Sequence, residues 1–115
     1  MAITRIDSGP RMSRAVVHGD TVYLQGLTAT NPSEDIKGQT RQVLARIEEA
    51  LAQVGSNKSK LLSVNIWLSN IGHFAGMNEV WDAWVDKANA PARATVESKL
   101  ARPEILVEMM CVAAK

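Results

Sequence analysis

The chain has 115 residues, of which 46% are hydrophobic and 22% charged, and its 13 lysines and arginines against 12 aspartates and glutamates leave a net charge of +1. This length suits a single domain over residues 1–115, and the composition is that of a globular protein, not of a disordered or fibrous chain. The balanced charge predicts binding neither to nucleic acid nor to an anionic membrane surface.

The first half of the chain predicts three strands and a helix. A short edge strand over 3–6 precedes two segments rich in β-forming residues, 14–18 and 21–25, which Gly19 and Asp20 join as a tight hairpin. Residues 26–32 are typical of a loop. Residues 35–54 predict a helix that Gly55 ends. Its apolar residues recur at helical spacing: Val43, Leu44, Ile47, Leu51 and Val54.

The second half predicts a strand, a helix and two further strands. From 62 to 69, Leu62, Val64, Ile66 and Leu68 alternate with Ser63, Asn65, Trp67 and Ser69, which is the period of a strand. A helix over 73–86 places Phe74, Met77, Val80, Trp81 and Trp84 on one side, where we expect the tryptophans to pack in the core and not to form a ligand cage. Pro91 breaks this helix, and strands over 93–98 and 105–114 follow.

The last predicted strand is apolar on both faces between Ile105 and Val112, as strands buried on both sides are. Two helices among about six strands can cover only one face of a single sheet. We therefore expect another copy of the chain to cover the second face, which makes the protein a homo-oligomer.

Several kinds of site lack their residues. His18 and His73 stand apart and no zinc-binding spacing occurs, so we expect no metal, a solvated His18 and a local hydrogen bond from His73. No glycine-rich nucleotide motif or nucleophile elbow is present. Cys111 cannot form an internal disulfide, and in its apolar strand it predicts a buried structural thiol. With no apolar leader or membrane span, the chain predicts a soluble cytoplasmic protein.

Two charged residues are candidates for a site. Glu108 is a carboxylate in an apolar strand, where burial is costly unless the group is paired, so it predicts either a structural ion pair or a functional site. Arg93 opens a predicted strand on which Arg93, Thr95 and Glu97 share one face. It is either a solvated strand end, which the residues alone favour, or a guanidinium fork that binds a carboxylate.

Both residues lie in segments that match a known family. Residues 91–97, Pro-Ala-Arg-Ala-Thr-Val-Glu, match a PAR-x-x-V-E signature, and Val107 to Ala113 match a terminal VEIE-x-x-A strand. Supporting matches in the same order are Gly9-Pro10 with Ser13, Val22 to Gly26, Gln39 to Gln42, and Phe74 with Met77-Asn78. Over nearly its whole length the chain thus resembles the Rid or YjgF-like proteins, the reactive intermediate/imine deaminases.

The resemblance implies an α+β fold of the chorismate-mutase-like type, a mixed six-stranded sheet with two helices on one face. It places the last strand in mid-sheet and implies a homotrimer with sites in clefts between subunits. Active members of the family hydrolyse 2-imino acids and their enamine tautomers, such as 2-aminoacrylate and 2-iminobutanoate, to 2-keto acids and ammonia. These imines form when pyridoxal-phosphate dehydratases act on serine or threonine, or when amino acids are oxidised. The hydrolysis needs no metal or cofactor.

The resemblance also assigns roles to residues. Arg93 matches the arginine that holds the substrate carboxylate, and Glu108 matches the acidic residue near the attacking water. Gly26, Thr95 and Asn78 complete the predicted substrate-binding set. Which subunits supply Arg93 and Glu108 to one site stays open at this point.

Departures from the family pattern leave the substrate open. Met12 stands where the better-known members carry a tyrosine, Gln25-Gly26-Leu27 replaces S-G-Q, and Thr95 replaces a cysteine. These changes alter the pocket wall and suit a bulkier or more polar imine. Two other functions remain: a non-catalytic carboxylate-binding or interaction protein on the same scaffold, and a ribonuclease or translation inhibitor, which the near-neutral charge does not support.

Overall fold

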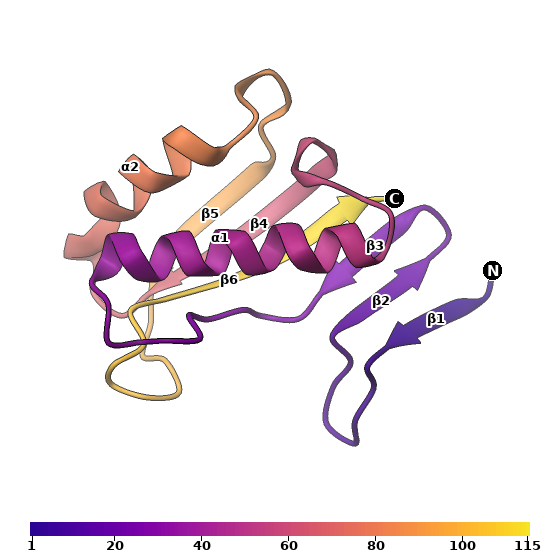
Figure 1. Cartoon of the computed structure of the whole chain (residues 1–115), viewed down its shortest axis with the longest axis horizontal. Coiled ribbons are helices and arrows are strands. Elements are labelled where there is room, and N and C mark those ends of the chain that lie inside the picture. The colour runs from indigo at the N-terminus through magenta and orange to yellow at the C-terminus, as the bar shows by residue number, and fades with distance from the viewer.

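A computed structural model describes residues 1–115. Six strands form one mixed sheet, and two α-helices lie over one of its faces (Figure 1). The strands are β1 (Ile3–Ile6), β2 (Ala15–His18), β3 (Thr21–Leu24), β4 (Leu61–Leu68), β5 (Ala92–Glu97) and β6 (Val107–Ala114). The helices are α1 (Ile36–Gln53) and α2 (Phe74–Trp84). The predicted fold class and element order are thus confirmed.

The sheet has the order β1-β2-β3-β6-β4-β5, so the last strand lies in mid-sheet between β3 and β4, as expected. β4 and β5 run parallel and are connected through α2, whereas every other neighbouring pair is antiparallel. Gly19 takes a positive φ of 61° in the turn between β2 and β3. β5 is therefore an edge strand, and the helix before it lies beside it (Figure 1).

The ends of α1 follow from local chemistry. The Asp35 carboxylate accepts a hydrogen bond from the backbone N–H of Gly38 at 2.9 Å, which caps the helix start. Gly55 follows the helix with a φ of 76°, a conformation that glycine adopts without a steric cost. Near its start, the buried Gln39 amide donates to the carbonyls of Pro32, Glu34 and Glu104 and accepts from the Leu106 N–H. It ties α1 to the loop that leads into β6.

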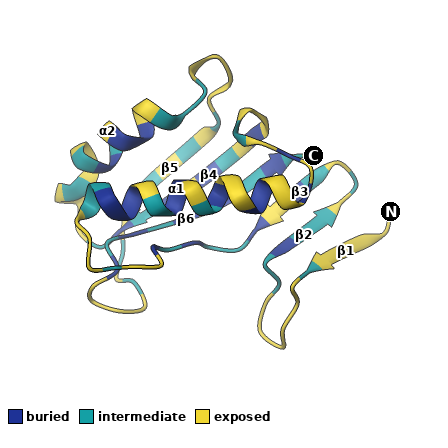
Figure 2. Cartoon of the chain, viewed as in Figure 1, coloured by how far each residue is buried: buried dark blue, intermediate teal, exposed yellow.

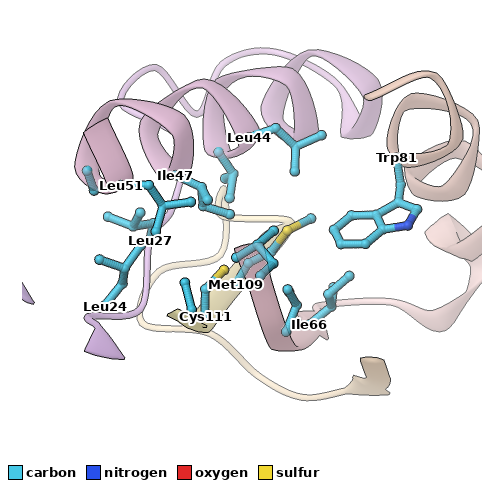
Figure 3. Close-up of a cluster of buried hydrophobic side chains, with 14 of the residues drawn as sticks. Leu24, Leu27, Leu44, Ile47, Leu51, Ile66, Trp81, Met109 and Cys111 are labelled. Carbon is cyan, nitrogen blue, oxygen red and sulfur yellow. The ribbon is translucent and has the colours of Figure 1, made fainter. Parts of the chain in front are cut away.

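The core lies between the helices and the sheet (Figure 3). Leu44, Ile47 and Leu51 of α1 pack onto alternate residues of the central strands. On β6 these are Val107, Met109, Cys111 and Ala113, all buried. The residues between them point to the other face, since side chains alternate along a strand.

The face of the sheet away from the helices stays open in the single chain. Along the strands, exposed residues alternate with buried ones (Figure 2). By strand register, Tyr23, Val96 and Met110 lie on this face, and they are 43–50% exposed. Exposed apolar side chains of this kind occur both singly on protein surfaces and at interaction sites. That another copy of the chain covers this face stays a prediction.

Three details correct the sequence predictions. A β-bulge between Leu61 and Ser63 shifts the register of β4, so Leu61 is buried and Leu62, predicted on the core side, is 51% exposed. The helix predicted over 73–86 spans only Phe74–Trp84, and Phe74 is exposed whereas Trp81 is buried. The last strand begins at Val107 and not at residue 105.

Candidate functional site

The predicted site residues fall into two groups on opposite faces of the sheet. In the register of the strands, Arg93 on β5 pairs with Val64 of β4, and Glu108 on β6 pairs with Trp67 of β4. Positions 64 and 67 differ by an odd number, so their side chains point to opposite faces. Val64 is buried toward the helices. Arg93 therefore lies on the helix-bearing face, and Glu108 lies on the open face.

Arg93 is half-buried against the aromatic side chains of α2. Its guanidinium carbon lies 5.1 Å from the centre of the Trp81 ring and 6.0 Å from that of the Phe74 ring, the geometry of a cation–π contact. No carboxylate pairs with it, and the guanidinium N–H groups have no acceptor in the chain, since Arg46 is the arginine whose side chain donates a hydrogen bond. The guanidinium is held in place by the rings while its hydrogen-bond donors stay free for a ligand.

Two further predicted residues accompany Arg93. Thr95 pairs with Ile66 of β4 and so shares the face of Arg93, and its hydroxyl is buried without a hydrogen-bond partner. Phe74, Asn78 and Trp81 are spaced i, i+4 and i+7 along α2, so they form one stripe of the helix. Asn78 is half-buried within that stripe. Arg93, Thr95 and Asn78 thus belong to one group at the β5 edge.

Glu108 and Gly26 form the second group. Glu108 is half-buried, and no cation of the chain pairs with it. A Cβ atom on Gly26 would overlap Glu108 Oε2 and would lie 3.3 Å from its Cδ, so the carboxylate occupies the space that a side chain at position 26 would need. The structural ion pair that the sequence left open does not form within the chain. Glu108 instead presents an unpaired carboxylate on an otherwise largely apolar face.

The remaining predicted residues lie outside both groups. His18 is exposed, as expected, whereas His73 precedes α2 without forming a side-chain cap, so the predicted local hydrogen bond is absent. Cys111 is buried, which raises the pKa of its thiol to about 12. No three His, Cys, Asp or Glu side chains are placed to hold a metal ion. Neither helix has the length and apolar composition needed to cross a membrane.

Sequence reasoning missed the contact between Arg93 and the aromatic rings. It assigned Trp81 and Trp84 to the core, which is correct for the buried Trp81 and partly so for the half-buried Trp84. It did not assign Phe74 and Trp81 to Arg93. The i, i+4, i+7 stripe was the available signal, but only the parallel pairing of β5 with β4 shows that Arg93 lies beneath it.

Comparison with known proteins places this arrangement in a family. The family model described as Endoribonuclease L-PSP matches residues 2–115. The RutC family protein YoaB of Escherichia coli K12 is 43% identical over 114 residues, which cover 99% of both chains. The chain belongs to the YjgF/RutC family. The Rid/YjgF-like resemblance of its signature segments is thereby confirmed.

Solved structures of YjgF/RutC-like proteins share the whole fold. A protein from Pseudomonas aeruginosa is 42% identical, with a TM-score of 0.96 and coverage of 99% of both chains. The YjgF family member NMB1025 from Neisseria meningitidis is 43% identical, also with a TM-score of 0.96, over 100% of this chain and 96% of its own. In this fold Arg93 and Glu108 lie on opposite faces, so one chain alone does not bring them together.

Proposed function

We propose that this YjgF/RutC family protein hydrolyses reactive 2-imino acids and their enamine tautomers to 2-keto acids and ammonia. The observation that carries the proposal is a pair of charged side chains that form no salt bridge within the chain. Arg93 has free donors above two aromatic rings, and Glu108 is an unpaired carboxylate beside Gly26. An unpaired charge at a half-buried position lowers the stability of the fold, so its presence there favours a role in binding a ligand.

We propose further that the two groups meet between subunits of a homotrimer. Arg93 lies near the β5 edge, and Glu108 lies on the open apolar face that a neighbouring copy would cover. A head-to-tail contact of this edge with that face closes into a ring and leaves one site at each of its three interfaces. The site would then take Arg93, Asn78 and Thr95 from one chain and Gly26 and Glu108 from the next.

The residue types suffice for the reaction. The planar guanidinium of Arg93 binds the substrate carboxylate through two parallel hydrogen bonds, which orients the electrophilic carbon of the protonated imine. Glu108 orients a water molecule and accepts one of its protons as the oxygen attacks that carbon, which gives a carbinolamine.

Glu108 then donates this proton to the amine. The carbon–nitrogen bond breaks as the hydroxyl oxygen forms the keto group, and the hydroxyl proton leaves with ammonia as ammonium. One imino acid and one water are thus converted to one 2-keto acid and one ammonium ion. Imines also hydrolyse in water without a catalyst, so orienting the water and the substrate supplies the needed acceleration.

The test is ammonia release from imines that an amino-acid oxidase generates in situ. We expect the wild-type protein to accelerate release, Arg93→Lys to be markedly impaired because it loses the planar fork, and Arg93→Ala to be nearly inactive. Arg41→Ala, at an exposed arginine of α1, is the matched control and should retain the wild-type rate. Equal rates for the wild type and Arg93→Ala would contradict the proposal.

Two other functions give different results in the same set of measurements. A non-catalytic carboxylate-binding protein would bind 2-keto acids through Arg93, and not the corresponding amides, without accelerating ammonia release. The description of the matched family model favours RNA cleavage as a second candidate. An RNA degradation assay should therefore include the wild type, Arg93→Ala and Glu108→Gln. RNA cleavage that both variants retain would come from other residues or from a contaminating nuclease.

A further inference from the structure

A pocket opens on the sheet face that carries Glu108. It has a volume of ≈ 290 Å³ and lies where the segment before β2 meets β3 and β6. Its wall includes Met12, Val16, Tyr23, Gln25, Gly26 and Met110. This volume is close to the lower end of the range for small-ligand sites, about 300–1,000 Å³. The pocket therefore suits one small organic group.

The wall of the pocket is apolar and carries no charge. Five of its eight lining residues are hydrophobic, and none is an acid or a base. The hydroxyl of Ser13, which also lines it, is 2.8 Å from the Ser8 hydroxyl and shares a hydrogen bond with it. Met12 is 60% exposed, and Tyr23 and Met110 are each 43% exposed. A ligand group that covers these side chains would remove apolar surface from water.

The pocket is next to the Glu108 carboxylate, with Gly26 between the two. Gly26 lines the pocket and lies against the Glu108 side chain. Met110 follows Glu108 by two residues on β6, so both side chains point to the same face. A substrate whose imine carbon lies beside Glu108 would therefore extend its side chain toward Met110 and Met12.

We propose that this pocket selects 2-imino acids with a bulky apolar side chain, branched aliphatic, thioether or aromatic. The proposal rests on the proposed deaminase function. Two flexible thioethers adapt to different apolar shapes, which favours a class of side chains over a single one. The lining holds no charged residue that could pair with a carboxylate or an ammonium on the substrate side chain, so imines of acidic and basic amino acids are disfavoured.

The test compares kcat/KM for imines generated from alanine, leucine, phenylalanine and glutamate. We expect the leucine- and phenylalanine-derived imines to exceed the alanine-derived imine by about tenfold or more, because added apolar groups in a fitting pocket have effects of this size. The glutamate-derived imine should fall well below both. Met12→Asp should reduce the ratio of the leucine to the alanine value, whereas Ile71→Asp, at a residue 49% exposed and outside the pocket, should leave that ratio unchanged.

The possible outcomes separate this proposal from the function on which it rests. Equal acceleration of all four imines, or a preference for the glutamate-derived one, overturns the pocket proposal and leaves the deaminase function standing. A leucine-to-alanine ratio that is the same in Met12→Asp as in the wild type also overturns it. No acceleration of any imine overturns the deaminase function, and the pocket proposal with it.

Discussion

Gly26→Ala tests whether the position of the Glu108 carboxylate matters. A methyl group at position 26 would overlap Glu108 Oε2 and would lie 3.3 Å from Cδ and 3.6 Å from Cγ. Ordinary contacts begin near 3.4 Å, so the carboxylate has to move while Cγ can stay in place. The overlapped atom is the end of a flexible side chain, and the backbone of Gly26 does not have a positive φ. The fold therefore tolerates alanine at position 26, and the Glu108 carboxylate is the group that has to move.

A displacement of about 1 Å at a reacting group costs up to about 100-fold in rate. We expect kcat/KM for imine hydrolysis to fall by about 10- to 100-fold, which is about 1.4–2.7 kcal/mol. The melting temperature should shift by no more than about 6 °C, because a Gly→Ala change in a compatible conformation alters stability by no more than about 1 kcal/mol. Gly9→Ala is the control, since its methyl group would lie 3.8 Å from the Met12 carbonyl oxygen, an ordinary contact.

A double-mutant cycle sharpens this test. Glu108→Asp shortens the side chain by one methylene and relieves the overlap with the added methyl group, so Gly26→Ala should cost less in the Glu108→Asp variant than in the wild type. Strict additivity of the two effects would show that the side chains do not interact. A wild-type rate in Gly26→Ala would refute the reasoning that the Glu108 carboxylate is held in a required position.

The other predictions concern Glu108, Phe74 and Cys111. Glu108→Gln keeps the size of the side chain but removes the base, so kcat should fall by about 100- to 10,000-fold with an unchanged melting temperature. A lower melting temperature with normal turnover would instead assign Glu108 to an ion pair with another subunit. Phe74→Leu removes one of the two rings that contact Arg93, and a cation–π contact of this kind contributes about 0.5–1 kcal/mol. KM and the Kd of a 2-keto acid should therefore rise about two- to fivefold with little change in kcat. An unchanged Kd would exclude this positioning role. Burial raises the pKa of Cys111 to about 12, above the ordinary thiol value, so above pH ~8.5 the folded state keeps a proton that the unfolded state releases. The free energy of unfolding is therefore unaffected at pH 7 but falls by up to about 1.4 kcal/mol per pH unit above pH ~8.5. Urea unfolding from pH 7 to 10 should show this loss in the wild type relative to Cys111→Ala, and parallel curves for the two proteins would contradict it.

Most of the fold follows from periodicity in the sequence. The helical spacing from Val43 to Val54 and the capping residues Asp35 and Gly55 predict α1 to within a residue at each end. The hairpin of β2 and β3 follows from Gly19 and Asp20 between two β-rich segments. These elements are defined by local interactions, which a single sequence carries in full.

The errors arise where a distant segment decides the local structure. Leu62 fits the alternation of β4, but a bulge opposite β6 shifts the register and leaves Leu62 51% exposed. The burial of the polar Gln39 is a feature for which no prediction was made, because its partners are carbonyl and N–H groups of loops as far away as Leu106. Neither a register shift nor a long-range hydrogen bond leaves a periodic signal.

The candidate site was predicted only in part. Glu108 was identified as a charge in an apolar strand, whereas for Arg93 the residues alone favoured a solvated strand end. The family resemblance supplied the proposed roles of both. Their separation onto two faces could not be predicted, because it depends on the register of β5 and β6 against β4. The same is true of the contact between Arg93 and the Trp81 and Phe74 rings.

Subunit complementation is the most direct test of the central claim, that Arg93 of one chain and Glu108 of another form one imine-hydrolysing site. Arg93→Ala and Glu108→Gln chains, each carrying a different affinity tag, are co-expressed, and oligomers with both tags are purified. Each variant alone should be nearly inactive. In every mixed trimer one of the three interfaces joins an intact Arg93 to an intact Glu108, so activity should return to about a third of the wild-type value. Mixed oligomers as inactive as the separate variants would contradict the claim.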